Sequence, residues 1–257
     1  MLNEIKEYWE EATPMNFSAE KWSYIQKRDF RYNLQDYMYE SFGFQDFKGQ
    51  RVLEVGCGSG LDAIEFAKNG AIVTAVDITD NAIQQTMQNS IEAGVSITVM
   101  PTLQSQFLPF PNDSFDLVYS FGVLHHIPDV EVMLQEIRRV LKPCGKFMGM
   151  VYNKDSLLFA YSIIYLHGIK NKKYLDSFSL GTIDKLTAQY SERIENCPYT
   201  KAYTKKEARE LFGNYFKEVE IEVKYNVLDL PGERKVKIDI DDKWELGWHL
   251  IIKGVKV

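Results

Sequence analysis

Over residues 51–152, short apolar runs alternate with stretches in which the apolar residues are more widely spaced. Short apolar runs such as RVLEVG and AIVTAVDI are typical of buried strands. Between them, apolar residues recur every three or four positions, as in DVEVMLQEIRRVLKPCG, which predicts amphipathic helices. Further strands are predicted at VSITVM, FDLVYSFG and GKFMGMVYN. Strands and helices that alternate in this way predict an α/β fold, a parallel sheet with helices on both faces.

Capping residues mark the ends of two predicted helices. In DNAIQQTMQNSIEAG, Asp80 is the expected N-cap and Gly94 the expected end of the helix. In TKKEARELFGNY, Thr204 and Glu207 have the spacing of a capping box. Two more strands, FKEVEIEVKYNV and WELGWHLIIKGVKV, are expected to complete the sheet.

Two segments interrupt or precede this alternation. Residues 1–48 are rich in aromatic side chains and have helix-compatible spacing, and residues 153–203 read as helical and irregular. We therefore expect an N-terminal helical lid segment at 1–48. A single α/β domain would follow over 49–257, with an insertion at about 153–203 after its fifth strand.

Composition narrows the class of protein. The chain of 257 residues can bury a large core, and its net charge of −6 argues against nucleic acid as a partner. Three widely spaced cysteines suit neither a disulfide framework nor a metal clip, so we expect no metal. The N-terminus has no signal-peptide core, and the longest apolar stretch, LLFAYSIIYL, is about half the ~20 residues of a membrane span. A cytoplasmic protein without a membrane span is predicted.

A glycine-rich loop follows the first predicted strand. Gly56, Gly58 and Gly60 would let a ligand approach the backbone at the carboxyl end of the strand, as dinucleotides and S-adenosylmethionine do. A dinucleotide fingerprint needs a third glycine where Leu61 stands. The carboxylate of Glu54 would repel a pyrophosphate and would suit the sulfonium and ammonium groups of S-adenosylmethionine.

Asp77 ends the second predicted strand. An acidic residue at this place accepts hydrogen bonds from the hydroxyls of a ribose. Because both cofactors contain a ribose, Asp77 indicates a nucleoside without choosing between them.

Four motifs in order resemble one enzyme family. VLEVGCGSG, VDI, LPFPNDSFDLVYSFGVLHHIPD and EIRRVLKPCGKF resemble the successive motifs of class I S-adenosylmethionine-dependent methyltransferases, above all the small-molecule branch with the ubiquinone and menaquinone methyltransferases. The likeness is close over 51–152 and loose over 201–254. It implies a Rossmann-like, seven-stranded, mostly parallel sheet whose last strand, at GWHLIIKG, is antiparallel. It also implies S-adenosyl-L-methionine as cofactor and S-adenosyl-L-homocysteine as product.

The resemblance assigns cofactor contacts residue by residue. Those for the methionine moiety would be Glu54, Gly56, Cys57, Gly58 and Gly60; for the ribose, Asp77; for the adenine, Ile78; and beside the cofactor, Ser120, Phe121 and Gly122. Family members often have Gly-Asp-Ala before LPFP, where this chain has Gln104, Ser105 and Gln106. Gln104 could still accept a hydrogen bond from the adenine amine.

Two adjacent histidines follow the fourth strand. A histidine with an ordinary pKa near ~6.5 is a suitable general base, and we take His126, or its neighbour His125, as the candidate. The alternative is that one of them caps a helix or packs under the loop. Cys57 is interpreted as a small residue beside the ligand rather than a redox sensor, and Cys144 as a turn residue rather than a nucleophile.

Aromatic residues are the candidate substrate contacts. They come from the N-terminal segment, the end of the fifth strand and the insertion: Tyr8, Trp9, Tyr24, Tyr152, Tyr199 and Tyr203. The alternative for the N-terminal ones is ordinary packing of a helix.

The predicted activity is methyl transfer to an O, N or C atom of a small molecule by in-line displacement, in a monomer or homodimer. Alternatives are a nucleic-acid or protein methyltransferase, a nicotinamide oxidoreductase and a non-catalytic binding module.

Overall fold

The central sheet has seven strands, and the last strand of the chain lies between two earlier ones. The computed structural model describes residues 2–12, 22–102, 107–170, 180–192, 197–230 and 233–257. From one edge to the other the strands are β3 (Thr98–Pro101), β2 (Ile72–Asp77), β1 (Arg51–Val55), β4 (Phe115–Phe121), β5 (Leu141–Tyr152), β9 (His249–Val255) and β6 (Lys217–Lys224). Strands β3 to β5 are parallel, and β9 runs antiparallel to both β5 and β6. The predicted Rossmann-like sheet with an antiparallel last strand is confirmed.

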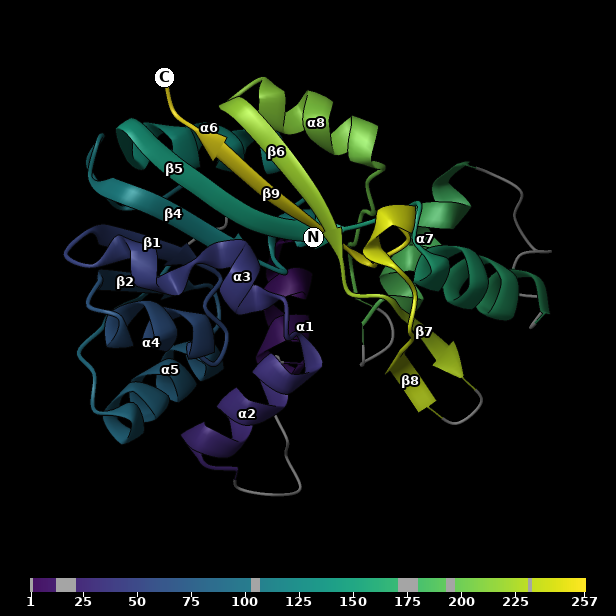
Figure 1. The fold of residues 1–257 in the computed structure, drawn as a ribbon, viewed down its shortest axis with the longest axis horizontal. Coiled ribbons are helices and arrows are strands. Elements are labelled where there is room, and N and C mark those ends of the chain that lie inside the picture. Colours follow the sequence, from purple (N-terminus) through teal and green to yellow (C-terminus); the bar gives the residue numbers. More distant parts are fainter. Residues whose placement is uncertain (1, 13–21, 103–106, 171–179, 193–196, 231–232) are drawn as a thin grey trace.

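Helices cover both faces of the sheet (Figure 1). One face carries α2 (Tyr24–Leu34), α3 (Met38–Phe42), η1 (Phe44–Phe47), α4 (Leu61–Lys68) and α5 (Asp80–Ala93); the other carries α6 (Val130–Val140) and α8 (Lys205–Gly213). Successive side chains of a strand point to opposite faces, so Tyr119 of β4 joins one hydrophobic cluster and Val118 joins the other. The inner strands β1, β4 and β9 are buried on both sides, as continuous apolar runs predict, whereas the edge strands β3 and β6 are partly exposed.

The start of one helix differs by one residue from the sequence prediction. The N-cap of α5 is Thr79, whose hydroxyl accepts a hydrogen bond from the amide of Ala82, and Asp80 is the first helical residue. Gly94 ends α5 in the left-handed conformation (φ 69°), as predicted. The capping box of Thr204 and Glu207 at the start of α8 is confirmed.

The insertion after β5 contains η3 (Leu158–Lys170), a π-helix, and α7 (Leu180–Tyr190). A hairpin of β7 (Val227–Leu230) and β8 (Glu233–Lys237) lies beside η3, where the Ser162 hydroxyl accepts a hydrogen bond from the Asp229 amide (Figure 1). The prediction of one strand over FKEVEIEVKYNV is therefore corrected, because the strand breaks after Lys224 at the positive φ of Tyr225.

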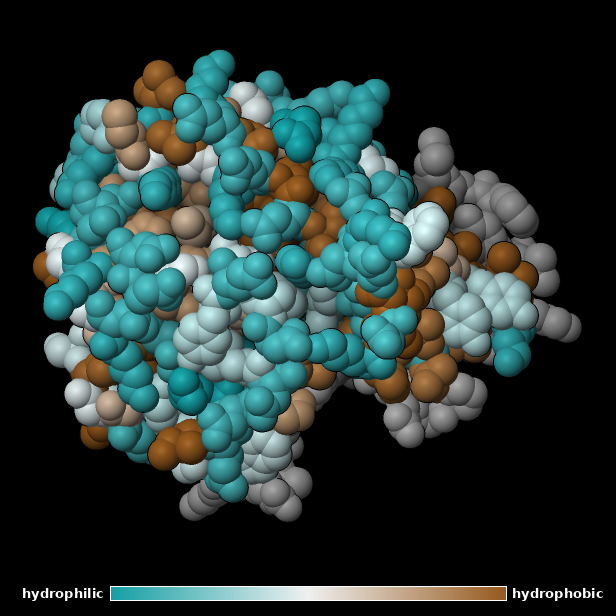
Figure 2. Space-filling view, in the orientation of Figure 1, coloured by the Kyte–Doolittle hydropathy of each residue, from teal (hydrophilic) through white to brown (hydrophobic). Residues whose placement is uncertain are grey.

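The surface of the insertion is more apolar than most of the molecule. Figure 2 shows hydrophilic residues over much of the sheet domain and brown, hydrophobic ones gathered toward η3 and the hairpin. Tyr161, Tyr165 and Ile169 of η3 are among the exposed large hydrophobic side chains. No helix within the described part of the chain has the length and apolar character to cross a membrane.

Candidate functional site

A cavity of about 310 Å³ lies at the carboxyl ends of the first four strands. Its wall includes Gly56 and Gly58 after β1, Asp77 at the end of β2 and Gly122 after β4. On the open side it is lined by α1 (Leu2–Ala12), which contributes Asn3, Ile5, Lys6 and Trp9. The carboxyl edge of a parallel sheet is where α/β proteins bind ligands, and this volume is near the lower end of the ~300–1,000 Å³ typical of ligand pockets.

The glycine loop makes a close turn over the end of β2. The amides of Gly56 and Cys57 donate to the carbonyl of Val76, at 2.8 and 3.1 Å. Gly56 has a φ of 77°, and a Cβ there would lie 2.2 Å from a methyl of Val123. Only glycine therefore fits this position without moving the wall of the cavity.

Two polar side chains of α5 hold the carbonyls of the same loop. The hydroxyl of Thr86 donates to the carbonyl of Gly58 at 3.0 Å, and the amide of Asn89 donates to the carbonyl of Ser59 at 2.7 Å. The sequence interpretation missed both residues. Their signal was a pair of polar residues, three positions apart, on the inward face of an amphipathic helix.

Asp77 lines the cavity and also anchors the loop. Its carboxylate accepts from the amide of Gly58 at 3.0 Å and from the amide and hydroxyl of Thr79 at 3.0 and 2.8 Å. Burial raises the pKa of Asp77, while these hydrogen bonds act in the opposite direction. Ile78 lines the cavity next to it. The positions suit the predicted contacts with a ribose and an adenine, which remain predictions.

Glu54 lies behind the loop and is not part of the cavity wall. Its side chain is buried, and its Oε2 atom has no hydrogen-bond partner among the described residues. Burial first, and then the charge of Asp62, raise the pKa of Glu54 well above its usual range, while Arg31 acts in the opposite direction. A cationic group entering the cavity would favour the ionised form of the Glu54 carboxyl group.

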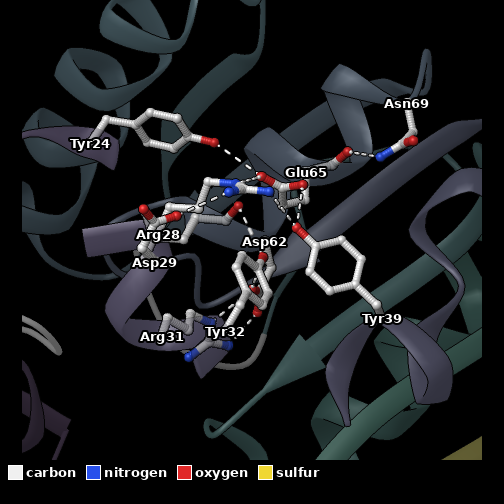
Figure 3. Close-up of polar contacts among 10 residues, drawn as sticks. Tyr24, Arg28, Asp29, Arg31, Tyr32, Tyr39, Asp62, Glu65 and Asn69 are labelled. Carbon is white, nitrogen blue, oxygen red and sulfur yellow. Dashed lines mark hydrogen bonds and ion pairs between the residues drawn. The ribbon is translucent and has the colours of Figure 1, made fainter. Parts of the chain in front are cut away.

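The N-terminal segment is fixed to α4 by two buried carboxylates (Figure 3). Arg31 pairs with Asp62, at 2.8 Å between Nε and Oδ1, and Arg28 pairs with Glu65 at 2.7 Å. The hydroxyl of Tyr24 donates to Glu65 at 3.1 Å. Tyr24 therefore belongs to the packing of α2 on α4, which corrects its interpretation as a substrate contact.

Helix α1 is held over the cavity by contacts with the start of α5, including an ion pair of Lys6 with Asp80 at 3.6 Å. Glu10 accepts hydrogen bonds from the amides of Asp80 and Asn81, at 3.0 and 2.8 Å, in the first turn of α5. Trp9 lies edge-on to the His126 ring, with centroids 4.8 Å apart, and Tyr8 packs against Trp9 without lining the cavity. The arrangement makes α1 a cover of the cavity.

The two histidines lie in η2 (Leu124–His126), directly after β4. Both are buried, but only His126 lines the cavity. Its Nδ1 is 3.0 Å from the carbonyl of Tyr199, a backbone contact with the insertion. His125 faces away, against the ring of Tyr152 at 3.8 Å between centroids. Burial and the neighbouring His126 hold the pKa of His125 well below its usual range, which disfavours it as a base.

His125, His126 and Glu192 form a compact group of potential donors. One ligand atom from each lies within 4.8 Å of the others, a spacing that could hold a metal ion. The positive charge of Lys235 acts on all three, lowering the pKa of both histidines and of the carboxyl group. A second cation would have to compete with this ammonium group.

Several predicted site residues lie behind the cavity. The Cys57 thiol points to the Thr86 hydroxyl at 3.4 Å, and the Ser120 hydroxyl donates to the carbonyl of Val55. The predicted residues that do not line the cavity are Glu54, Cys57, Gly60, Ser120, His125, Tyr8, Tyr24, Tyr152, Tyr199 and Tyr203. Those on the wall are Gly56, Gly58, Asp77, Ile78, Phe121, Gly122, His126 and Trp9. Gln104, Ser105 and Gln106 lie outside the described residues.

Comparison with known proteins identifies the central part of the chain. Residues 53–149 match the model of a methyltransferase domain. The ubiquinone biosynthesis O-methyltransferase of Xanthomonas oryzae pv. oryzae is 31% identical over 119 residues, 46% of this chain and 50% of that protein. The enzyme of the same name from Coxiella burnetii is 31% identical over 117 residues, with the same shares. The chain thus spans about half the length of the curated relatives it matches.

Solved structures share the fold over nearly the whole chain. A possible histamine N-methyltransferase from Thermotoga maritima covers 98% of this chain and 100% of its own, with a TM-score of 0.58 and 17% identity. The [4+2]-cyclase SpnF covers 100% and 96%, with a TM-score of 0.63 and 16% identity. Together with the domain match, these findings confirm the resemblance to class I S-adenosylmethionine-dependent methyltransferases.

Proposed function

We propose that this chain, whose residues 53–149 match a methyltransferase domain, transfers a methyl group from S-adenosylmethionine to an O, N or C atom of a small molecule. The observation that carries the proposal is the cavity at the carboxyl edge of the sheet, walled by the glycine loop and Asp77 and covered by α1. The ubiquinone O-methyltransferases among its relatives favour a small-molecule acceptor.

The residues of the cavity suit a cationic nucleoside cofactor. Glycines at 56 and 58 leave room at the loop for the methionine part, and Asp77 and Ile78 stand where the ribose and adenine would lie. Behind the loop, the Glu54 carboxyl group is buried with an unpartnered Oε2, and an ammonium or sulfonium group would favour its ionised form, whereas a pyrophosphate would oppose it. The cofactor would supply a methyl group bonded to an electron-poor sulfur.

The protein's contribution to the rate would be alignment and exclusion of water. Helix α1 covers the cavity, so an acceptor held beside Trp9 and His126 would react away from bulk solvent. Alignment of two reactants in a closed site accounts for much of the acceleration that such a displacement needs.

Titration calorimetry with S-adenosylmethionine, S-adenosylhomocysteine and NADH tests the proposal. We expect binding of the first two and none of NADH. In Asp77→Asn the affinity should fall by about 10- to 100-fold, because a charge-assisted hydrogen bond contributes ~1.5–3 kcal/mol. The exposed Asp113→Asn is the matched control and should bind normally. Binding of NADH alone would refute the proposal.

A further inference from the structure

Two histidines and a carboxylate from the insertion meet beside the cavity. His125 and His126 lie in η2 after β4, and Glu192 follows α7. One ligand atom from each lies within 4.8 Å of the others, and within the described ranges of the chain this is the one group of three such donors. Their spacing along the sequence gave no signal of a metal site, because the fold brings them together from separate segments.

Three ring nitrogens of this group lack hydrogen-bond partners. They are Nδ1 and Nε2 of His125 and Nε2 of His126, all buried and without a bond to any described residue. Buried polar atoms are nearly always hydrogen-bonded, so three exceptions in two adjacent rings require an explanation. A ring nitrogen with a free lone pair is satisfied by a metal ion as well as by a hydrogen-bond donor.

The other nitrogen of His126 is held in the way that metal-binding histidines are. Nδ1 lies 3.0 Å from the carbonyl of Tyr199. A carbonyl can only accept, so this contact favours a hydrogen on Nδ1 and a lone pair on Nε2. Histidines that bind metals typically donate their second nitrogen to a carbonyl or carboxylate, which fixes the orientation of the ring.

The distance between His126 and Glu192 suits two ligands of one ion. Nε2 of His126 lies 3.7 Å from Oε1 of Glu192, which is too far for a hydrogen bond. Zinc binds nitrogen and oxygen at about 2.0–2.2 Å, so at the tetrahedral angle two of its ligand atoms lie about 3.4 Å apart. The gap is therefore close to the spacing that a shared zinc ion would impose.

Tyr152 supports two of the three donors. Its hydroxyl donates to Oε1 of Glu192 at 2.7 Å, and its ring packs on His125 with centroids 3.8 Å apart. A carboxylate has lone pairs on two oxygens, so this hydrogen bond orients Glu192 and still leaves it able to bind an ion. Hydrogen bonds of this kind to ligand side chains are typical of the outer shell of metal sites.

We propose that His125, His126 and Glu192 form a binding site for a divalent transition metal, with Zn²⁺ as the ion that these donors fit. Two histidines and one carboxylate occur together in zinc sites that keep a fourth position for water or substrate. The harder Mg²⁺ and Ca²⁺ prefer oxygen ligands alone. The ion would join the insertion to the end of β4, and the site does not depend on the proposed function.

A lysine of the β7–β8 hairpin opposes the ion. Nζ of Lys235 lies 5.8 Å from the centroid of the Tyr152 ring, and its charge acts on all three donors. Two cations close to one another repel, so the ammonium group lowers the affinity that the donors alone would give. In Lys235→Met the binding of Zn²⁺ should therefore become tighter, which a zinc site elsewhere on the surface would not show.

Titration calorimetry of the full chain without a histidine tag, using Zn²⁺ as the probe, tests the site. We expect one ion per chain in the wild type. Tyr152→Phe keeps all three ligands and should weaken binding by about 10- to 100-fold, as changes in the outer shell do. Glu192→Gln removes a ligand and should lose at least about 100-fold. The exposed Glu210→Gln is the matched control and should bind as the wild type does.

Hydrogen exchange provides a second measurement that does not depend on affinity. Because the ion would join the insertion to η2, Zn²⁺ should slow the exchange of amides in α7 of the wild type and leave it unchanged in Glu192→Gln. Circular dichroism without metal identifies a variant that does not fold, and the wild type and Lys235→Met then decide the question.

Three results would overturn the inference. The first is a wild type that binds no Zn²⁺. The second is equal affinity in the wild type and in folded Glu192→Gln, which would place the ion elsewhere. The third is binding of Zn²⁺ that leaves the exchange of α7 unchanged and is no tighter in Lys235→Met.

Discussion

Alanine at Gly56 should cost more stability than alanine at Gly94, which has the same left-handed backbone conformation. A Cβ at this position would lie 2.2 and 2.9 Å from the two methyls of Val123. The left-handed conformation, with a φ of 77°, costs an alanine about 1–2 kcal/mol. Forcing the cavity wall outward adds about 1–3 kcal/mol. The total of about 2–5 kcal/mol is a large part of the ~5–15 kcal/mol by which a domain is stable.

The chain offers a control that separates the backbone strain of a positive φ from the steric overlap of the new Cβ. Gly94 has a φ of 69° with nothing within 4 Å of a Cβ, so Gly94→Ala carries only the conformational cost. Urea unfolding of both variants measures the difference, expected at about 1–3 kcal/mol. In the background Val123→Ala, which removes the two methyls, the excess cost should largely disappear. Equal losses for Gly56→Ala and Gly94→Ala would refute the steric argument.

The variants Gly56→Ala and Gly94→Ala also test the function of the glycine loop. Because Gly56 lines the cavity, a displaced loop should weaken binding of S-adenosylmethionine by about tenfold or more, equivalent to ~1.4 kcal/mol. Gly94→Ala lies at the far end of α5 and should leave this affinity unchanged. Titration calorimetry at a temperature where both variants are folded makes the comparison.

Two further predictions concern the N-terminal segment. In Glu10→Ala, the lost hydrogen bonds to α5, worth ~1.5–3 kcal/mol as charge-assisted contacts, should speed hydrogen exchange in α1 and weaken cofactor binding. Glu7→Ala, an exposed neighbour, is its control, and equal exchange in both would contradict the covering role. In Arg31→Met, the buried carboxylate of Asp62 loses its cation, so the free energy of unfolding should fall by about 3–5 kcal/mol. A loss no larger than in the exposed Arg209→Met would argue against the pair.

Elements with a strong local pattern could be predicted from the sequence. The alternation of apolar runs and amphipathic stretches determined the parallel sheet and its helices, because burial on both faces imposes a continuous apolar strand. The glycine loop and Asp77 were also recognisable, since close backbone approach permits few residue types. The start of α5 was misplaced by one residue, because Thr79 and Asp80 are both good caps and only the backbone distinguishes them.

Contacts between distant segments were decided by the tertiary structure. Nothing near Glu192 in the sequence indicates His126 as its neighbour, and the pairing arises because the insertion packs against the end of β4. Likewise Tyr24 was interpreted as a substrate contact from its type, whereas the fold turns its hydroxyl to Glu65.

The sequence by itself therefore determined the sheet and the glycine loop, because each follows from local periodicity and from the space a glycine leaves; the cofactor class stays a prediction. Only the tertiary structure decided which side chains reach the cavity, which carboxylates are paired, and that Nδ1 of His126 faces the carbonyl of Tyr199. These properties depend on burial and on charges from separate segments, and a side chain's pKa and partners are set by what folding brings within a few ångströms.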